Sequence, residues 1–143
     1  MSQLSPGSSL SFFEMVRKRW VELDTHVCVG LDSDYTRIPS SIKQQYKSIV
    51  DCLYQFNCRI IDATADLVCA FKPNIAFYES LGIDGLLALI KTNEYIHRKY
   101  PEIPIILDIK RGDVKSTNKG YVSAAFEIFN ADAITIHPYL GKE

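Results

Sequence analysis

Four short runs rich in valine, isoleucine and leucine recur along the chain, and they constrain its fold more than any other feature. The runs are VCVGL at 27–31, LVCAFK at 67–72, PIILDIK at 104–110 and DAITIH at 132–137. Each run is almost continuously apolar instead of alternating between apolar and polar residues, which is typical of parallel strands covered on both faces. The runs therefore predict four buried strands of a parallel sheet.

The segments between these runs have the periodicity of amphipathic helices. In the first segment, apolar residues recur every three or four positions, at Ile42, Tyr46, Ile49, Leu53, Phe56 and Ile60. Ser40 or Ser41 is available to cap that helix. Residues 84–99 predict a second helix after a capping Asp84, and residues 115–130 predict a third. The apolar stripe of the third helix consists of Tyr121, Ala124, Ala125 and Ile128.

A further helix is predicted before the first apolar run, because Ser11 and Glu14 have the spacing of a capping box. The chain is thus a leading helix followed by repeated strand–helix units, and its interior contains no linker, repeat or low-complexity segment. Such units predict an α/β domain with a parallel sheet and right-handed crossovers, either open or closed into a barrel.

The composition is that of an ordinary soluble domain. The chain has 143 residues, of which 47% are hydrophobic and 23% are charged, and its formal net charge is -1. This charge gives no electrostatic reason to expect a nucleic acid or an acidic membrane as partner. The longest apolar runs are too short to span a bilayer, and the first residues lack the pattern of a secretory signal. We expect a cytoplasmic protein with a flexible tail over residues 1–10 and one domain over 11–143.

The four cysteines show neither a CxxC pair nor a histidine spacing suited to zinc, so no metal site is predicted. Cys28 and Cys69 each lie inside an apolar run, where a free thiol packs as a small hydrophobic group. We expect all four to be reduced structural thiols.

Each of the four runs ends in a polar or ionisable residue or is followed directly by one. These residues are Asp32, Lys72, Asp108 with Lys110, and His137. The carboxyl ends of parallel strands lie on one side of the sheet, and α/β enzymes place their active sites there. One such residue could simply cap a helix or lie in a solvated loop, but the repetition indicates a functional site.

The third run gives the clearest geometry, in the stretch IILDIKRGDVKST at 105–117. Asp108 and Lys110 are two positions apart, so on an extended strand their side chains point to one face with Cα atoms roughly 6.5 to 7 Å apart. Asp113 lies beyond the strand and can swing back or reach a neighbouring subunit. A lysine between two carboxylates stays protonated and suits the role of a proton donor. The alternative is an ion-pair network that only stabilises the sheet edge, although buried ion pairs are poor stabilisers.

These motifs resemble those of one enzyme family. LDIKRGDV is similar to the D-x-K-x-x-D signature of the orotidine 5'-phosphate decarboxylases, and FKPNIAFYE at 71–79 resembles the second-strand motif of one branch of that family. VGLD at 29–32 and IHPYLG at 136–141 fall where its first-strand and fourth-strand motifs would. The resemblance implies the α/β class and a (β/α)8 TIM barrel, with only the first four strands present in this chain. Residues 11–143 would then be the N-terminal half of the barrel.

The resemblance also implies an activity: the conversion of orotidine 5'-monophosphate to uridine 5'-monophosphate and CO2, the last step of pyrimidine synthesis, with no metal or organic cofactor. On the matching positions, Lys110 would stabilise and protonate C6 of the pyrimidine, and Asp108 would lie near the carboxylate of the substrate. Lys72 would contact the ribose and join an alternating chain of lysines and aspartates. Asp32 would bond the ribose hydroxyls or the nearby lysine.

Further residues follow from the same resemblance. Asp113 would come from the partner subunit, and Thr117 would contribute a hydroxyl from the same segment, so the enzyme would be a homodimer with shared active sites. Asn74 would support Lys72 or the sugar, or else cap the turn that follows it. His137 would face the pyrimidine pocket or have a structural role.

The family has four more strands, which carry the loops that grip the phosphate. We therefore expect the isolated chain to be inactive without a second half. Two other functions remain open at this point. One is a related Mg²⁺-dependent barrel that decarboxylates or condenses sugar phosphates with the same motif. The other is a non-catalytic module that binds nucleotides and dimerises through the surface around 113–128.

Overall fold

The four apolar runs form parallel strands whose order in space follows their order in the chain. The computed structural model describes residues 10–139. Its strands are β1 (Cys28–Gly30), β2 (Ala70–Lys72), β3 (Ile106–Arg111) and β4 (Ala133–Ile136). β1 pairs with β2, and β3 pairs with β4. Single bridges from Phe71 to Ile105 and from Asn74 to Asp108 join the two pairs.

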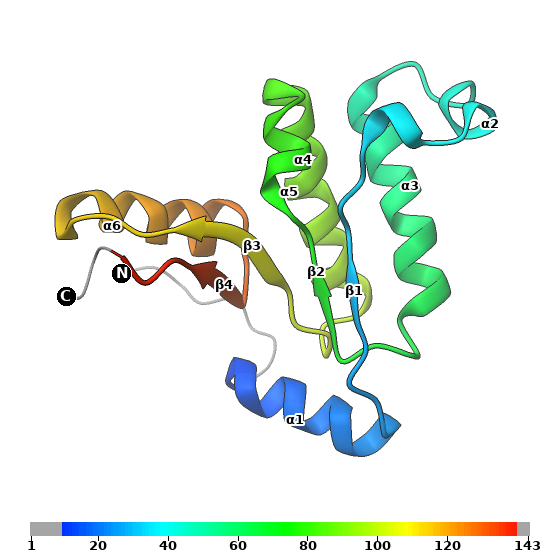
Figure 1. Cartoon of the computed structure of the whole chain (residues 1–143). Helices are drawn as coiled ribbons and strands as arrows, with labels where there is room; N and C mark the ends of the chain where they lie inside the picture. Colours follow the sequence, from blue (N-terminus) through cyan, green and yellow to red (C-terminus); the bar gives the residue numbers. More distant parts are fainter. Residues whose placement is uncertain (1–9, 140–143) are drawn as a thin grey trace.

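Helices connect the strands and cover the sheet. They are α1 (Phe12–Leu23), the 3-10 helix η1 (Tyr35–Arg37), α2 (Ser40–Lys43), α3 (Ile49–Thr64), α4 (Ile75–Glu79), α5 (Gly82–Lys99), α6 (Lys115–Val122) and the π-helix η2 (Ser123–Ile128). In Figure 1, α3 and α5 stand beside β1 and β2, while α6 runs beside β3. No helix among the described residues is both long and apolar enough to cross a lipid bilayer.

The main core lies between the first strands and the helices that follow them. Its fully buried members include Leu31, Ile61, Val68, Phe71, Ile96, Ile103 and Ile105. A second cluster, with Ile75, Tyr78, Leu89, Leu107, Ile109 and Phe129, continues the core under β3. Close packing on this apolar layer fixes the strands relative to one another, so the residues at their carboxyl ends have defined positions.

The leading helix begins as predicted, at a complete capping box formed by Ser11 and Glu14. It is attached to the sheet by Arg19, which is buried and donates through Nε and Nη2 to the carbonyl oxygen of Val68, at 2.9 and 2.8 Å. Nη2 also donates to the carbonyl oxygen of Ala65, the C-cap of α3. A guanidinium at the carbonyl end of a helix satisfies acceptors that have no partner within the helix.

The prediction of one helix across Ile42 to Ile60 was wrong, because the segment forms two helices. Ser48 has an extended backbone, and its hydroxyl accepts a hydrogen bond from the N–H of Asp51 at 3.0 Å, so it starts α3. The predicted caps Ser40 and Ser41 lie inside α2, whose N-cap is Pro39 and has no side-chain hydrogen bond. A strong N-cap inside an amphipathic pattern thus divided the helix.

Two other helix predictions need correction. α5 begins at Gly82, with a positive φ of 63°, so Asp84 lies in the first turn and is not the cap. The predicted helix over 115–130 changes to a π-helix at Ser123, where the N–H of Phe129 bonds to the carbonyl oxygen of Ala124. The wider turn rotates the later residues, so Ala125 is buried but Ile128 is exposed. The five-residue helix α4 was not predicted.

The four cysteines are free, and Cys52, Cys58 and Cys69 are buried as small apolar groups. Cys28 is exposed, so the prediction that it packs in the core was wrong. Its strand lies at one edge of the described sheet and pairs only with β2 there. The predicted flexible tail lies almost wholly outside the described residues, as does the end of the IHPYLG motif.

Candidate active site

Two lysines and one aspartate meet at the carboxyl end of β2 and β3. Lys72 Nζ donates to Asp108 Oδ2, and Lys110 Nζ donates to Asp108 Oδ1 at 2.5 Å. The side chain of Asp108 is only 7% exposed, whereas that of Lys110 is 64% exposed. The structure therefore places one buried carboxylate between two ammonium groups, of which the Lys110 ammonium is open to solvent.

The surroundings of Asp108 keep it ionised. Burial acts to raise the pKa of this carboxyl, but hydrogen bonds from Lys110, Lys72 and Thr135 outweigh it and hold the pKa well below its ordinary value. Asp108 is therefore a fixed negative charge at neutral pH. The lysines supply the compensating positive charge, as a buried carboxylate requires.

The backbone that carries Lys110 is not the extended strand that the sequence predicted. Lys110 has a φ of 46°, in the left-handed region, which costs a residue with a Cβ about 1 kcal/mol or more. The pairing register passes from Leu107 with Ile134 to Arg111 with Ile136. Three residues of β3 thus face one residue of β4, a bulge that aims a side chain at a sheet edge. Lys110 reaches Asp108 through this bulge.

Thr135 is a site residue that the sequence did not indicate. It is the β4 residue opposite the bulge, and its hydroxyl donates to Asp108 Oδ1 at 2.7 Å. The hydroxyl oxygen of Thr135 also accepts hydrogen bonds from the backbone N–H groups of Ile109 and Lys110, both at 3.1 Å. One polar residue inside the apolar run DAITIH was the only available signal.

Asp32 lies at the carboxyl end of β1, on the same side of the sheet, and is exposed. Among the described residues, its carboxylate forms no hydrogen bond with either lysine, since both bond to Asp108. The residues before and after it in the chain, Leu31 and Ser33, belong to a buried network of hydrogen bonds. Tyr78 donates to the carbonyl oxygen of Leu31 at 2.7 Å, and Ser33 donates to Asn57 Oδ1 at 2.5 Å.

Asn57 connects the two halves of this network, because its amide nitrogen donates to Tyr78 and to Thr92, both at 3.0 Å. Burial raises the pKa of Tyr78 well above its ordinary value, so the phenol remains a donor. The network fixes the backbone on both sides of Asp32 and leaves its carboxylate facing solvent.

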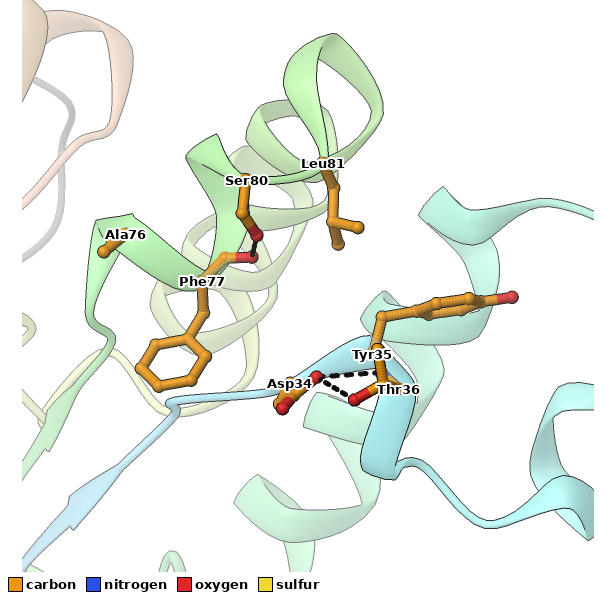
Figure 2. A pocket seen from close by; sticks show the side chains of 7 residues that line it. All are labelled: Asp34, Tyr35, Thr36, Ala76, Phe77, Ser80 and Leu81. Carbon is orange, nitrogen blue, oxygen red and sulfur yellow. Dashed lines mark hydrogen bonds between the residues drawn. The ribbon is translucent and has the colours of Figure 1, made fainter.

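Two adjoining concavities open beside Asp32. One has a volume of about 340 Å³ and lies between η1 and α4, and Figure 2 shows its lining side chains, Asp34, Tyr35, Thr36, Ala76, Phe77, Ser80 and Leu81. The other, of about 460 Å³, is lined by residues that include Asp32, Arg37 and Phe77. Neither contains Lys72, Asp108 or Lys110 in its lining, so the charged cluster is not part of either hollow.

Among the described residues, no hydrogen bond or ion pair joins Asp113 or Thr117 to the lysine–aspartate cluster. Asp113 Oδ1 accepts a hydrogen bond from the N–H of Val114 at 2.6 Å. Its backbone exchanges two hydrogen bonds with the side chain of Asn118, at 2.9 and 2.6 Å. Thr117 lies in the first turn of α6.

The remaining candidates have local roles in the structure. Asn74 is the N-cap of α4 and accepts a hydrogen bond from the N–H of Ala76 at 3.1 Å. This is one of the two roles that the sequence left open for it. The ring of His137 packs against Gly112, where an added Cβ would lie 3.0 Å from His137 Cε1.

Comparison with known proteins gives consistent matches. Residues 25–143 match the Orotidine 5'-phosphate decarboxylase / HUMPS family. The orotidine 5'-phosphate decarboxylase of Cellvibrio japonicus is 44% identical over 134 residues, which are 94% of this chain and 48% of the relative. That of Thermomicrobium roseum is 46% identical over 134 residues, or 94% of this chain and 45% of the relative.

A solved structure of Leishmania donovani OMP decarboxylase matches with a TM-score of 0.75 and 33% identity, over 92% of this chain and 46% of that one. The chain spans about half the length of the curated relatives that it matches. With the four parallel strands, these matches confirm the predicted fold class, an α/β chain with four strands of a (β/α)8 TIM barrel.

Proposed function

We propose that this chain forms part of an enzyme that converts orotidine 5'-monophosphate to uridine 5'-monophosphate and CO2. The chain belongs to the Orotidine 5'-phosphate decarboxylase / HUMPS family. The observation that carries the proposal is the array of Lys72, Asp108 and Lys110 at the carboxyl end of the strands. The relatives are about twice as long as this chain, so the activity is proposed for the chain together with the remainder of a barrel.

This decarboxylation requires fixed charges and a proton donor in the active site. When the bond between C6 and the carboxylate breaks, its electron pair stays on C6 and CO2 leaves. A carbanion at that carbon has little resonance stabilisation, so prearranged electrostatics must lower the barrier. Lys110, the more exposed ammonium, would stabilise the negative charge and donate its proton to C6. This route uses no metal or organic cofactor.

Asp108 would lie near the departing carboxylate and hold both lysines in place. Lys72 and Asp32 would contact the ribose, and Asn74 would do so through its amide nitrogen, because its Oδ1 caps α4. The hollow lined by Asp32 and the one adjoining it offer space for the rest of a nucleotide.

The enzyme would be a homodimer, in which the partner subunit completes each active site. The Asp113 carboxylate accepts a hydrogen bond from its own loop and forms no ion pair with the lysines of its own chain among the described residues, which supports a role for it, with Thr117, in the site of a second copy. Exposed apolar side chains at Val122, Phe126 and Ile128, on the segment that follows Asp113, support a subunit contact there.

Turnover of orotidine 5'-monophosphate, followed by its pyrimidine absorbance, tests the proposal. The chain is assayed alone and mixed with the segment of the Cellvibrio japonicus relative that it does not match. We expect activity only in the mixture, and Lys110→Ala to lower kcat by about 10²- to 10⁴-fold, the contribution of a positioned proton donor. Lys110→Gly repeats the test with a residue that accepts the left-handed backbone. Lys47→Ala, at an exposed lysine on the loop before α3, is the matched control.

Full turnover by both Lys110 variants would overturn the assignment of the proton donor. Loss of wild-type activity on adding EDTA would favour a Mg²⁺-dependent relative that acts on sugar phosphates. Binding of a uridine monophosphate analogue by the mixture without any turnover would favour a non-catalytic nucleotide-binding module.

A further inference from the structure

We propose that Thr135 is a positioning residue that sets the geometry of Asp108 and Lys110 through a single hydroxyl group. The inference rests on the proposed function, because it assigns Thr135 to the same site. The hydroxyl lies between the two residues: it donates to Asp108 Oδ1 and accepts from the backbone N–H of Lys110.

The hydrogen-bonding capacity of this hydroxyl is fully used. A threonine oxygen offers one donor and two acceptor positions. Here the donor goes to Asp108, and the two acceptor positions take the N–H groups of Ile109 and Lys110. Those N–H groups belong to the bulged residues of β3, which lie between the pairing of Leu107 with Ile134 and that of Arg111 with Ile136. Thr135 thus replaces the ladder hydrogen bonds that the bulge removes.

This arrangement couples backbone and side chain at the site. Asp108 Oδ1 is held from one side by Lys110 Nζ and from the other by Thr135, so the carboxylate plane has little freedom to rotate. The hydroxyl also fixes the N–H of Lys110, whose backbone has a positive φ. A catalytic geometry must be held within a fraction of an ångström, and supporting hydrogen bonds do this.

Two substitutions separate the hydroxyl from the shape of the side chain. Thr135→Val keeps a β-branched side chain of the same outline but leaves the two N–H groups without their acceptor and removes the donor to Asp108. Thr135→Ser keeps the hydroxyl. Thr64→Val removes a threonine hydroxyl that bonds only within α3, to the carbonyl oxygen of Ile60, and serves as the control.

The first readout uses the 143-residue chain by itself and needs no activity. In isotope-labelled protein, Thr135→Val should speed hydrogen exchange at the Ile109 and Lys110 amides by about tenfold or more, because their acceptor is gone. It should also raise the pKa of Asp108 in a carboxyl titration. Thr135→Ser should match wild type in both measurements. Unchanged exchange and an unchanged titration in Thr135→Val would overturn the inference, whether or not the protein is a decarboxylase.

The second readout is turnover in the mixture used to test the proposed function. Thr135→Val should lower kcat by about tenfold or more while changing KM little, because the substrate contacts remain. Thr135→Ser should restore kcat to within about threefold of wild type. If wild type turns over orotidine 5'-monophosphate and Thr135→Val does so equally well, the positioning role fails and the proposed function stands. If wild type shows no turnover, the proposed function fails and the exchange and titration measurements decide the inference.

Discussion

Asp108 receives hydrogen bonds from side chains on three different strands: Lys72 on β2, Lys110 on β3 and Thr135 on β4. An unpaired carboxylate at this depth would cost several kcal/mol to desolvate, so it is ionised only because these donors converge on it. The two lysines in turn depend on Asp108 as their shared counter-ion. Removing this one side chain therefore affects three strands at once.

The pH dependence of stability should report the state of Asp108. Its pKa is lower in the folded chain than in the unfolded chain, so its contribution to the free energy of unfolding is complete above the unfolded pKa of about 4. That contribution is lost as the pH falls from there through the folded-state pKa. Asp108→Asn should thus be less stable than wild type at pH 7, with a smaller loss of stability between pH 5 and pH 2.

Urea unfolding at a series of pH values measures this difference. Glu94→Gln is the matched control, since Glu94 is exposed on α5 and has no recorded ion pair among the described residues. It should follow the wild-type curve. An Asp108→Asn curve parallel to that of wild type below pH 5 would show that Asp108 does not carry this acid dependence.

At the scale of the elements, the positions of strands and helices could be predicted from the sequence where the interactions that form them are between residues close together in the chain. The four apolar runs contain the four strands. The prediction that all four are buried holds for β2 and for the middle of β3, where burial on both faces selects apolar residues. It was wrong for β1 and β4, whose residues are half-buried or exposed because these strands lie at the two edges of the described sheet. The start of α1 was predictable too, because the capping box of Ser11 and Glu14 is complete within four residues.

Other features depend on partners that lie far away in the sequence. In the bulge, the N–H of Lys110 bonds to the hydroxyl of Thr135, which is 25 residues later, so no pattern within 105–117 could reveal this contact. The meeting of Lys72 with Asp108 was foreseeable from the shared sheet edge, but their direct hydrogen bond depends on packing. The break before α3 was present in the sequence as Ser48 and was missed, because the apolar period continues across it.

The attachment of α1 offers a prediction at the same scale. Arg19 is buried against the end of α3 and the start of the β2 segment, where its guanidinium satisfies the carbonyl oxygens of Ala65 and Val68. Arg19→Met keeps most of the apolar stem but removes these charged hydrogen bonds. It should lower the free energy of unfolding by about 2–3 kcal/mol. The midpoint of urea unfolding, with an unchanged m-value, measures the loss.

Arg17→Met on the exposed side of α1 is the control for this experiment and should shift the midpoint little. Equal shifts for the two variants would mean that Arg19 contributes only helix propensity and surface charge, and not the attachment of α1.

On the scale of the whole molecule, the described sheet ends at β1 on one side and at β4 on the other, each paired with a single neighbour among residues 10–139. The last residue of β4, Ile136, is 69% exposed. An apolar edge strand has one side whose backbone N–H and C=O groups are unpaired, and this side is a template for pairing with another chain. In a closed barrel, both of these edges would be joined to further strands, because a closed barrel has no free strand edge.

The isolated chain should therefore self-associate, and its weight-average sedimentation coefficient should rise with protein concentration. Ile136→Lys places a charge on the β4 edge, where lysine opposes strand pairing, so it should reduce the rise. Ile83→Lys makes the same change at a still more exposed position, in the helix α5 and not on an edge strand, and should leave the rise intact. If the chain sediments as a monomer at all concentrations, or if both variants reduce association equally, the β4 edge is not the contact. A reduction specific to Ile136→Lys, together with loss of self-association when the complementary barrel segment is added, would identify that edge as the place where the rest of the barrel joins.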